Sequence, residues 1–281
     1  MRTEKELYDK ILGFAKTDER VRAVILNGSR ANPNVPPDKY RDFDIVYIVR
    51  EFESFKAYHG WIDIFGERLI LQTPEAMRYP DGSGHFNWML LLRDGNRIDL
   101  TLIPIERPEL ISNDSLSVTL LDKDGILPKF PEANDGDYII KPPSELFYCS
   151  CCNNFWWCLQ YVAKGLVRDE LPYAMTMYHN VVLSELHNML DWYIGASNGF
   201  AVSAGKMGKY YKQFLPGRLY RQYCCIYSAC VPEDIWRSLS AADDLFHETA
   251  LAVADNCGFT YNQGDEDGIR EYLQKLKNDE Y

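Results

Sequence analysis

Residues 26–45 read LNGSRANPNVPPDKYRDFDI, and this stretch decides how the first half of the chain folds. The apolar run at 21–27 predicts a buried strand that ends at a turn formed by Gly28 and Ser29. A loop rich in Pro and Asn follows, and the run at 42–49 reads as a second strand. Because side chains alternate along a strand, Asp42 and Asp44 project from the same face. The sequence therefore predicts a pair of carboxylates beside a Gly-Ser turn.

A third acid lies in another predicted strand. The run at 97–103 is rich in β-formers and carries Asp99 among apolar residues, where an acid is rare unless it pairs with or binds a cation. Three acids on neighbouring strands would form an oxygen-ligand site suited to Mg²⁺. Each motif alone also fits an ordinary turn or strand end. Their order along the chain, with apolar residues flanking every acid, favours a metal site made by Asp42, Asp44 and Asp99.

The turn after the first strand has the chemistry of a phosphate site. Gly28 has no Cβ, so backbone N–H groups can approach a phosphate closely. Ser29 adds a hydroxyl and Arg30 a fork of donors, and we expect these residues to meet the β- and γ-phosphates of a nucleotide. For Arg30 the alternative is an ion pair with a loop acid such as Asp38.

This order of strand, Gly-Ser turn, loop, Asp-x-Asp and third strand acid resembles the polymerase-beta-type nucleotidyltransferase superfamily. More narrowly, the chain is similar to the aminoglycoside 6-adenylyltransferases, which modify streptomycin. The resemblance rests on the segments at 26–34, 41–45 and 97–104, and on later segments at 121–125, 151–157 and 161–166.

The resemblance implies a reaction and its participants. A hydroxyl of an aminoglycoside, most simply the 6-hydroxyl of streptomycin, would attack the α-phosphorus of ATP and release pyrophosphate, a reaction tied to antibiotic resistance. Asp42 and Asp44 would hold Mg²⁺, and Asp99 would either complete the metal site or accept the hydroxyl proton. The open alternatives are an enzyme of the same fold that acts on another small molecule, a protein or RNA, and a non-catalytic binder of nucleotide or antibiotic.

Composition limits the partners. The 281 residues carry 41 acids against 30 bases, a formal charge of -11, which disfavours a protein that holds nucleic acid along its phosphates. A polycationic aminoglycoside fits this charge, whereas ATP needs local bases and Mg²⁺ to offset it. The polar opening and the lack of an 18-residue apolar run predict a cytoplasmic protein without a membrane partner, and we expect a monomer.

The pattern of elements predicts an α+β protein with two domains. Residues 1–140 would form a nucleotidyltransferase domain with a mixed sheet flanked by helices, starting with a helix that Thr3 and Glu6 cap. Further strands at 68–72 and 86–93 precede a hairpin turn at Asp94 and Gly95. Turn residues and two prolines at 135–143 mark the boundary. Residues 141–281 would form an all-helical substrate-binding domain, with helices at 144–166, 173–194 and 267–278.

The helical half offers four candidate site residues. Glu185 lies in an apolar run and would pair with a cationic substrate or, alternatively, with a core cation. Asp191 is a further substrate candidate, although six residues of helix rotate it off the face of Glu185. Lys206 or Lys209 would open a helix that faces the triphosphate, or would form a solvated basic helix end. The phosphate-loop pattern itself is absent there.

Other residue types predict packing rather than chemistry. The eight cysteines are expected to be buried free thiols, since no second pair with metal-site spacing follows the C-x-x-C at 149–152. The five histidines show no metal-ligand spacing. Trp156 and Trp157 are expected in the helical core.

Overall fold

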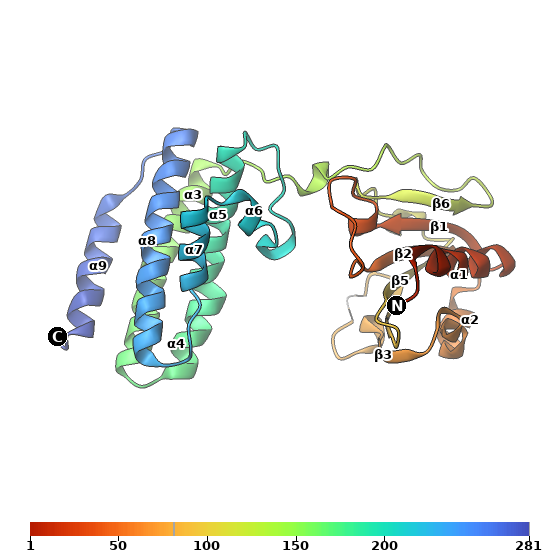
Figure 1. The fold of residues 1–281 in the computed structure, drawn as a ribbon, viewed down its shortest axis with the longest axis horizontal. Helices are drawn as coiled ribbons and strands as arrows, with labels where there is room; N and C mark the ends of the chain where they lie inside the picture. The colour runs from red at the N-terminus through yellow and green to blue at the C-terminus, as the bar shows by residue number, and fades with distance from the viewer. Residues whose placement is uncertain (81, 281) are drawn as a thin grey trace. The chain divides into compact units, whose positions relative to one another are not determined.

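A six-stranded mixed sheet forms one half of the protein and helices form the other, which confirms the predicted α+β class (Figure 1). The computed structural model describes residues 1–80 and 82–280. The chain separates into two units, Met1–Asp137 and Tyr138–Tyr281. This division falls inside the turn-rich segment at 135–143. Across the described residues, no helix combines the length and apolar character that a membrane crossing requires.

The sheet has the order β3-β4-β5-β2-β1-β6. Its central pair, β2 and β5, is parallel, and all other neighbours are antiparallel. The predicted hairpin joins β4 to β5, and Gly95 adopts a φ of 84° in its turn. The sequence did not predict β6. The strands are β1 (Val21–Asn27), β2 (Phe43–Val49), β3 (Arg68–Gln72), β4 (Phe86–Leu92), β5 (Arg97–Pro104) and β6 (Val118–Asp122).

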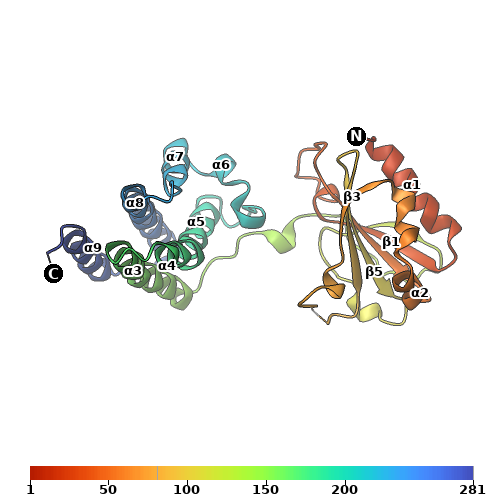
Figure 2. The ribbon, with the colours of Figure 1, turned by 90° about the horizontal axis from the view of Figure 1, so that it is seen from below.

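One face of the sheet is covered by helices. Figure 2 shows α1 (Glu4–Thr17) and α2 (Phe52–Ala57) on the same side, and the 3-10 segment η2 (His59–Phe65) joins them in one apolar core. The predicted capping box at Thr3 and Glu6 is present at the start of α1. Tyr47 of β2 is fully buried in this core, and its hydroxyl donates to the carbonyl of Ile11 at 2.6 Å. This hydrogen bond fixes the position of α1 against β2.

The opposite face is covered only in part. A small apolar cluster of Ala23, Ile25, Val46, Ile48 and Ile103 packs against side chains from the segment at 105–130. That segment contains the short η4 (Pro108–Leu110). Beyond this cluster the same face carries polar side chains, and the candidate site is built there.

The second unit is a helical bundle around an aromatic core. Phe155 of the first long helix stacks on Phe246 with ring centroids 3.8 Å apart, and both are fully buried. The predicted helix at 173–194 is interrupted by a π-helical turn, Tyr178–Val182. The helices are α3 (Glu145–Val167), α4 (Leu171–Met177), α5 (Leu183–Ser197), α6 (Tyr211–Phe214), α7 (Gly217–Cys225), α8 (Pro232–Cys257) and α9 (Gln263–Lys277).

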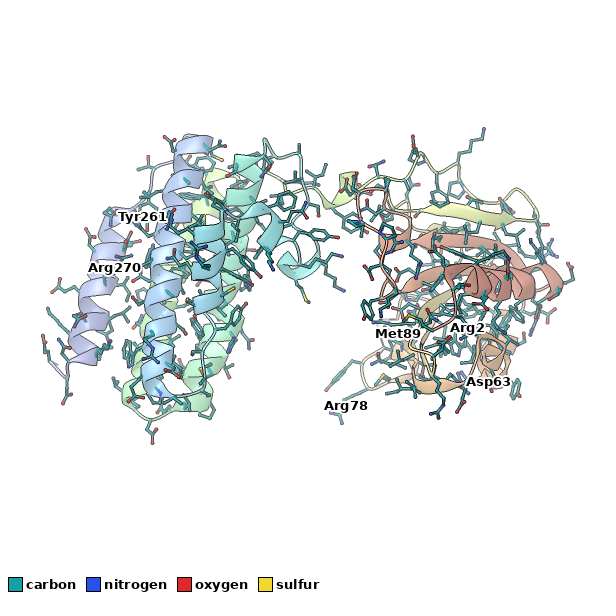
Figure 3. All side chains as sticks on the ribbon, in the orientation of Figure 1. Arg2, Asp63, Arg78, Met89, Tyr261 and Arg270 are labelled. Atoms are coloured by element: carbon teal, nitrogen blue, oxygen red, sulfur yellow. The ribbon has the colours of Figure 1, made fainter. Side chains whose placement is uncertain are left out.

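A buried carboxylate ties α9 to α8. Glu266 is 2% exposed, and its side chain accepts a 2.6 Å hydrogen bond from the hydroxyl of Tyr261 and lies 2.7 Å from Nδ1 of His247. Arg270, one turn further along α9, pairs with Glu266 at 3.0 Å and with Asp243 of α8 at 2.6 Å. Figure 3 labels Tyr261 and Arg270. A buried carboxylate needs such partners, because an unpaired buried charge is strongly destabilising.

Two sequence expectations about burial were wrong in part. All eight cysteines are free thiols as expected, but Cys149, Cys224, Cys225 and Cys230 are exposed. Trp156 is buried in the core, whereas Trp157 is 57% exposed. For Cys149 and Trp157 of the helix at 145–167 the reason is helix geometry: consecutive residues point about 100° apart, so neighbours in sequence cannot all face the core.

Candidate active site

Four neighbouring strands place one row of side chains across the partly open face of the sheet. Met89 of β4 lies opposite Asp99 of β5, Asp99 opposite Asp44 of β2, and Asp44 opposite Asn27 of β1. Side chains of paired residues project from the same face of a sheet. Figure 3 labels Met89, at one end of this row. Asp42 comes two residues before Asp44 and lies beside the same row. The fold thus brings together all three acids that the sequence singled out, from segments more than fifty residues apart.

Gly28 makes room for the central acid of this row. A Cβ at this position would lie 2.2 Å from Oδ2 of Asp44, and the residue has a φ of 71°. Both observations disfavour a larger side chain here, since it would be strained and would force the Asp44 carboxylate to move. The sequence analysis explained Gly28 by the close approach of a phosphate to the backbone. The structure adds that the Asp44 carboxylate packs against this glycine.

Arg97 bridges the two outer acids. Its Nε and Nη2 donate to the two carboxylate oxygens of Asp99 at 2.8 and 2.6 Å, and its Nη1 lies 3.3 Å from Oδ2 of Asp42. The sequence analysis missed this residue. The available signal was its place two residues before Asp99 on the same strand, which puts both side chains on one face.

Burial and nearby charges raise the pKa of two of these acids, Asp42 and Asp44. Burial, together with the nearby charges of Asp99 and Asp42, raises the pKa of Asp44 to about 6, against the opposing influence of Arg97 and Arg30. Burial and the charge of Asp99 also raise the pKa of Asp42, which Arg97 and Arg30 oppose. Hydrogen bonding to Asp99 raises the pKa of Arg97. The site therefore concentrates negative charge and favours a cation.

The donor set suits a metal ion that arrives with phosphate. Across residues 1–80 and 82–280, no three His, Cys, Asp or Glu side chains are arranged to hold a metal ion by themselves. Mg²⁺ is commonly bound by one or two carboxylates together with waters and substrate phosphates. Carboxylate oxygens from Asp42, Asp44 and Asp99, beside a turn with no side chain at Gly28, fit that arrangement.

Arg30 has a different environment from the one predicted. Its side chain is 4% exposed, and it donates to the carbonyls of Asp42 at 2.9 Å and Arg41 at 2.7 Å. It also pairs with Glu4 at 3.2 Å and lies over the ring of Phe43. The acid partner is thus Glu4 and not Asp38. These contacts favour a role in fastening the loop before β2 over direct contact with phosphate.

Arg41 is a second residue that the sequence analysis did not single out. Its Nη1 donates to the carbonyl of Ser29 at 3.1 Å, which links the turn of η1 (Gly28–Arg30) to the loop before Asp42. Its Nε is buried without a hydrogen-bond partner among the described residues. A buried donor in this state is a candidate for an acceptor supplied by a ligand.

Two acids predicted to bind substrate lie in the helical unit. Glu185 accepts hydrogen bonds from the side-chain amides of Asn154 at 2.7 Å and Asn188 at 3.3 Å. Asp191 accepts a 2.7 Å bond from the hydroxyl of Tyr211. Burial raises the pKa of Asp191, against the effect of the Tyr211 bond. Both acids therefore bond to neutral groups among the described residues. For Glu185 the sequence analysis offered a core ion pair as the alternative to substrate binding, and these contacts are not an ion pair.

The two lysines do not open a regular helix, which corrects the sequence expectation. Lys206 begins a single 3-10 turn, η7 (Lys206–Gly208), and Lys209 follows it. Gly205, Met207 and Gly208 all have positive φ, so the chain turns sharply here instead of continuing as a helix. Both lysines are exposed.

Comparison with known proteins identifies similar chains. The family model described as streptomycin adenylyltransferase matches residues 1–276. Aminoglycoside 6-adenylyltransferases from Campylobacter jejuni and Bacillus subtilis are 42% and 39% identical, over 99% and 98% of this chain and 96% and 98% of their own length. The relative from Staphylococcus aureus is 33% identical over 93% of this chain and 94% of its own. The solved aminoglycoside 6-adenyltransferase from Bacillus subtilis is 34% identical, covers 99% of each chain and gives a TM-score of 0.48.

Proposed function

Because the chain belongs to the aminoglycoside 6-adenylyltransferase family, we propose that it transfers AMP from ATP to a hydroxyl of an aminoglycoside and releases pyrophosphate. The proposed acceptor is the 6-hydroxyl of streptomycin, in line with the family description and the names of the relatives. The observation that carries this proposal is the pairing of Asp44 with Asp99 beside Asp42 and Gly28, because it supplies the acids that phosphoryl chemistry needs.

Each acid has a proposed role. Asp42 and Asp44 would hold Mg²⁺, which when bound neutralises charge on the phosphates and helps to orient the reacting groups. Asp99 would complete the same site or accept the proton of the sugar hydroxyl, since a carboxylate within hydrogen-bond reach is a competent base. Asn27, opposite Asp44, is held by the hydroxyl of Ser117, which donates to Asn27 Oδ1 at 3.1 Å and so fixes the end of the row.

The turn at Gly28 and Ser29 would meet the β- and γ-phosphates. Arg41 joins this group in our proposal, because its buried Nε has no partner within the described part of the chain. Arg30 would not contact the phosphates itself. It would position Arg41 and Asp42 by donating hydrogen bonds to their backbone carbonyls. Lys206 and Lys209 are exposed, and their proposed role is to donate hydrogen bonds to phosphate oxygens.

The helical unit would bind the antibiotic. Glu185 and Asp191 would pair with guanidinium or ammonium groups of the antibiotic. Their amide and hydroxyl partners are neutral, so the negative charge of each carboxylate remains available to a cation. One opposite charge at about 4 Å is worth on the order of 4 kcal/mol at an effective dielectric near 20, before desolvation. The net charge of -11 attracts the same polycation at longer range.

The central experiment is a transfer assay with an isosteric variant. The protein is incubated with MgATP and streptomycin, and the product is detected by mass spectrometry as the AMP adduct of the antibiotic. Asp42→Asn should abolish the adduct while the circular dichroism spectrum is retained. Asp63→Asn is the matched control, because Asp63 is an exposed acid of η2, on the helix-covered side of the sheet (Figure 3).

Two results would contradict the proposal. The first is a folded wild-type protein that forms no adduct, and the second is full activity in Asp42→Asn.

For the helical unit, Glu185→Gln and Asp191→Asn should raise KM for streptomycin more than KM for ATP. The control is Glu233→Gln, at an exposed acid in the first turn of α8.

A further inference from the structure

Arg97 lies where a cation is expected between two of the proposed metal-binding acids. All three of its guanidinium nitrogens are engaged, two with Asp99 as a bidentate pair and one with Asp42. Bidentate pairs of this kind are among the stronger charged contacts in proteins. The guanidinium therefore supplies the positive charge that the three carboxylates require when no other cation is bound.

The side chain also has a route out of the site. It is 40% exposed, and it stands at the first residue of β5, next to the hairpin turn at Gly95. Arg30, by contrast, is 4% exposed and is held by backbone carbonyls. Of these two arginines, Arg97 is the one that can leave its carboxylates without unpacking the fold.

We propose that Arg97 is a counter-ion that stands in for the divalent cation and moves from Asp42 and Asp99 to the nucleotide phosphates when metal and nucleotide bind together. This inference rests on the proposed function. A metal ion that arrives alone must displace the guanidinium and leave it without a carboxylate partner. A nucleotide supplies phosphate oxygens as new partners, so binding of metal and nucleotide is positively coupled.

The consequence is a site that discriminates against free metal. In the absence of nucleotide, Arg97 competes for the same oxygens and weakens the affinity for the ion. Removing the competing charge should tighten binding of a divalent ion about tenfold, comparable to the effect of one nearby charge on a carboxylate's proton affinity. It should also reduce the factor by which nucleotide tightens metal binding.

The test measures Mn²⁺ binding by electron paramagnetic resonance, with and without a nonhydrolysable ATP analogue. Without analogue, Arg97→Gln should bind Mn²⁺ about tenfold more tightly than the wild type. Arg97→Lys keeps the charge but loses the bidentate fork, so it should fold readily and show a smaller gain. Arg107→Gln is the matched control, since Arg107 is an exposed arginine beyond the far end of β5 and also pairs with an acid two residues on, Glu109.

Each outcome decides a separate point. Unchanged or weaker Mn²⁺ binding in both Arg97 variants, or equal tightening in Arg107→Gln, overturns the counter-ion proposal. If the Mn²⁺ pattern holds but the wild type forms no streptomycin adduct, the proposed function fails and the counter-ion role stands. If the adduct forms but the pattern is absent, the proposed function stands and the role of Arg97 is rejected.

Discussion

Replacing Asp44 by Asn should stabilise the metal-free protein while it abolishes AMP transfer. Asp44 packs against Gly28 and lies beside Asp99, and its pKa is raised from 3.8 to about 6 by burial and by the charges of Asp99 and Asp42. Between these pH values the folded protein retains a proton that the unfolded chain has lost. The contribution of Asp44 to stability therefore falls as pH rises from about 4 to about 6, because at this group the unfolded state binds fewer protons there.

The magnitude follows from the same values. The difference between about 6 and 3.8 is about two pH units, and each unit is worth 1.36 kcal/mol, so ionised Asp44 costs the folded state about 3 kcal/mol at neutral pH. Asn keeps the shape and carries no charge. Because its amide must find new partners, we expect a net gain of about 1–3 kcal/mol in the free energy of unfolding at pH 7.5.

The assay is denaturant unfolding in EDTA at a series of pH values. The gap between Asp44→Asn and the wild type should be largest at pH 7.5 and should shrink towards zero near pH 4. Asp9→Asn is the control; Asp9 is an exposed acid of α1 that pairs with Lys5, so its loss should change stability by no more than about 0.5 kcal/mol. A variant that is no more stable than the wild type at pH 7.5, or a gap that does not depend on pH, would refute the reasoning.

Three further substitutions test other contacts. Gly28→Ala places a Cβ 2.2 Å from Asp44 Oδ2 at a φ of 71°, so unfolding should become easier by about 1–3 kcal/mol and adduct formation should fall at least about a hundredfold; retained activity would contradict the packing argument. Arg30→Gln removes two bonds to loop carbonyls and should cost about 2–3 kcal/mol in denaturant unfolding, with little change in KM for ATP. A large rise in that KM at unchanged stability would instead assign Arg30 to the phosphates. Glu266→Gln removes the buried charge that Arg270 and Tyr261 contact, while Arg270 keeps Asp243 at 2.6 Å, so it should cost about 1–3 kcal/mol, read from loss of helical circular dichroism on heating; an unchanged transition would show that the network does not fasten α9.

The sequence by itself determined the parts of this protein that depend on local periodicity. The two-residue period of a strand predicted a shared face for Asp42 and Asp44, although β2 begins only at Phe43, and the capping box at Thr3 and Glu6 marked the start of α1. The Asp-Gly turn gave the hairpin that carries Asp99. These features involve residues a few positions apart, so the backbone dihedrals and side-chain period are enough to predict them.

Only the tertiary structure decided which distant groups meet. The parallel pairing of β2 with β5 sets Asp44 against Asp99, and the turn after β1 brings Gly28 against the same carboxylate. This packing also fixes burial and charge neighbours. It buries Arg30 beside Glu4 and the loop carbonyls, which favours a structural role over the expected contact with phosphate. Contacts across tens of residues depend on strand order and register, and no local pattern in the chain encodes these.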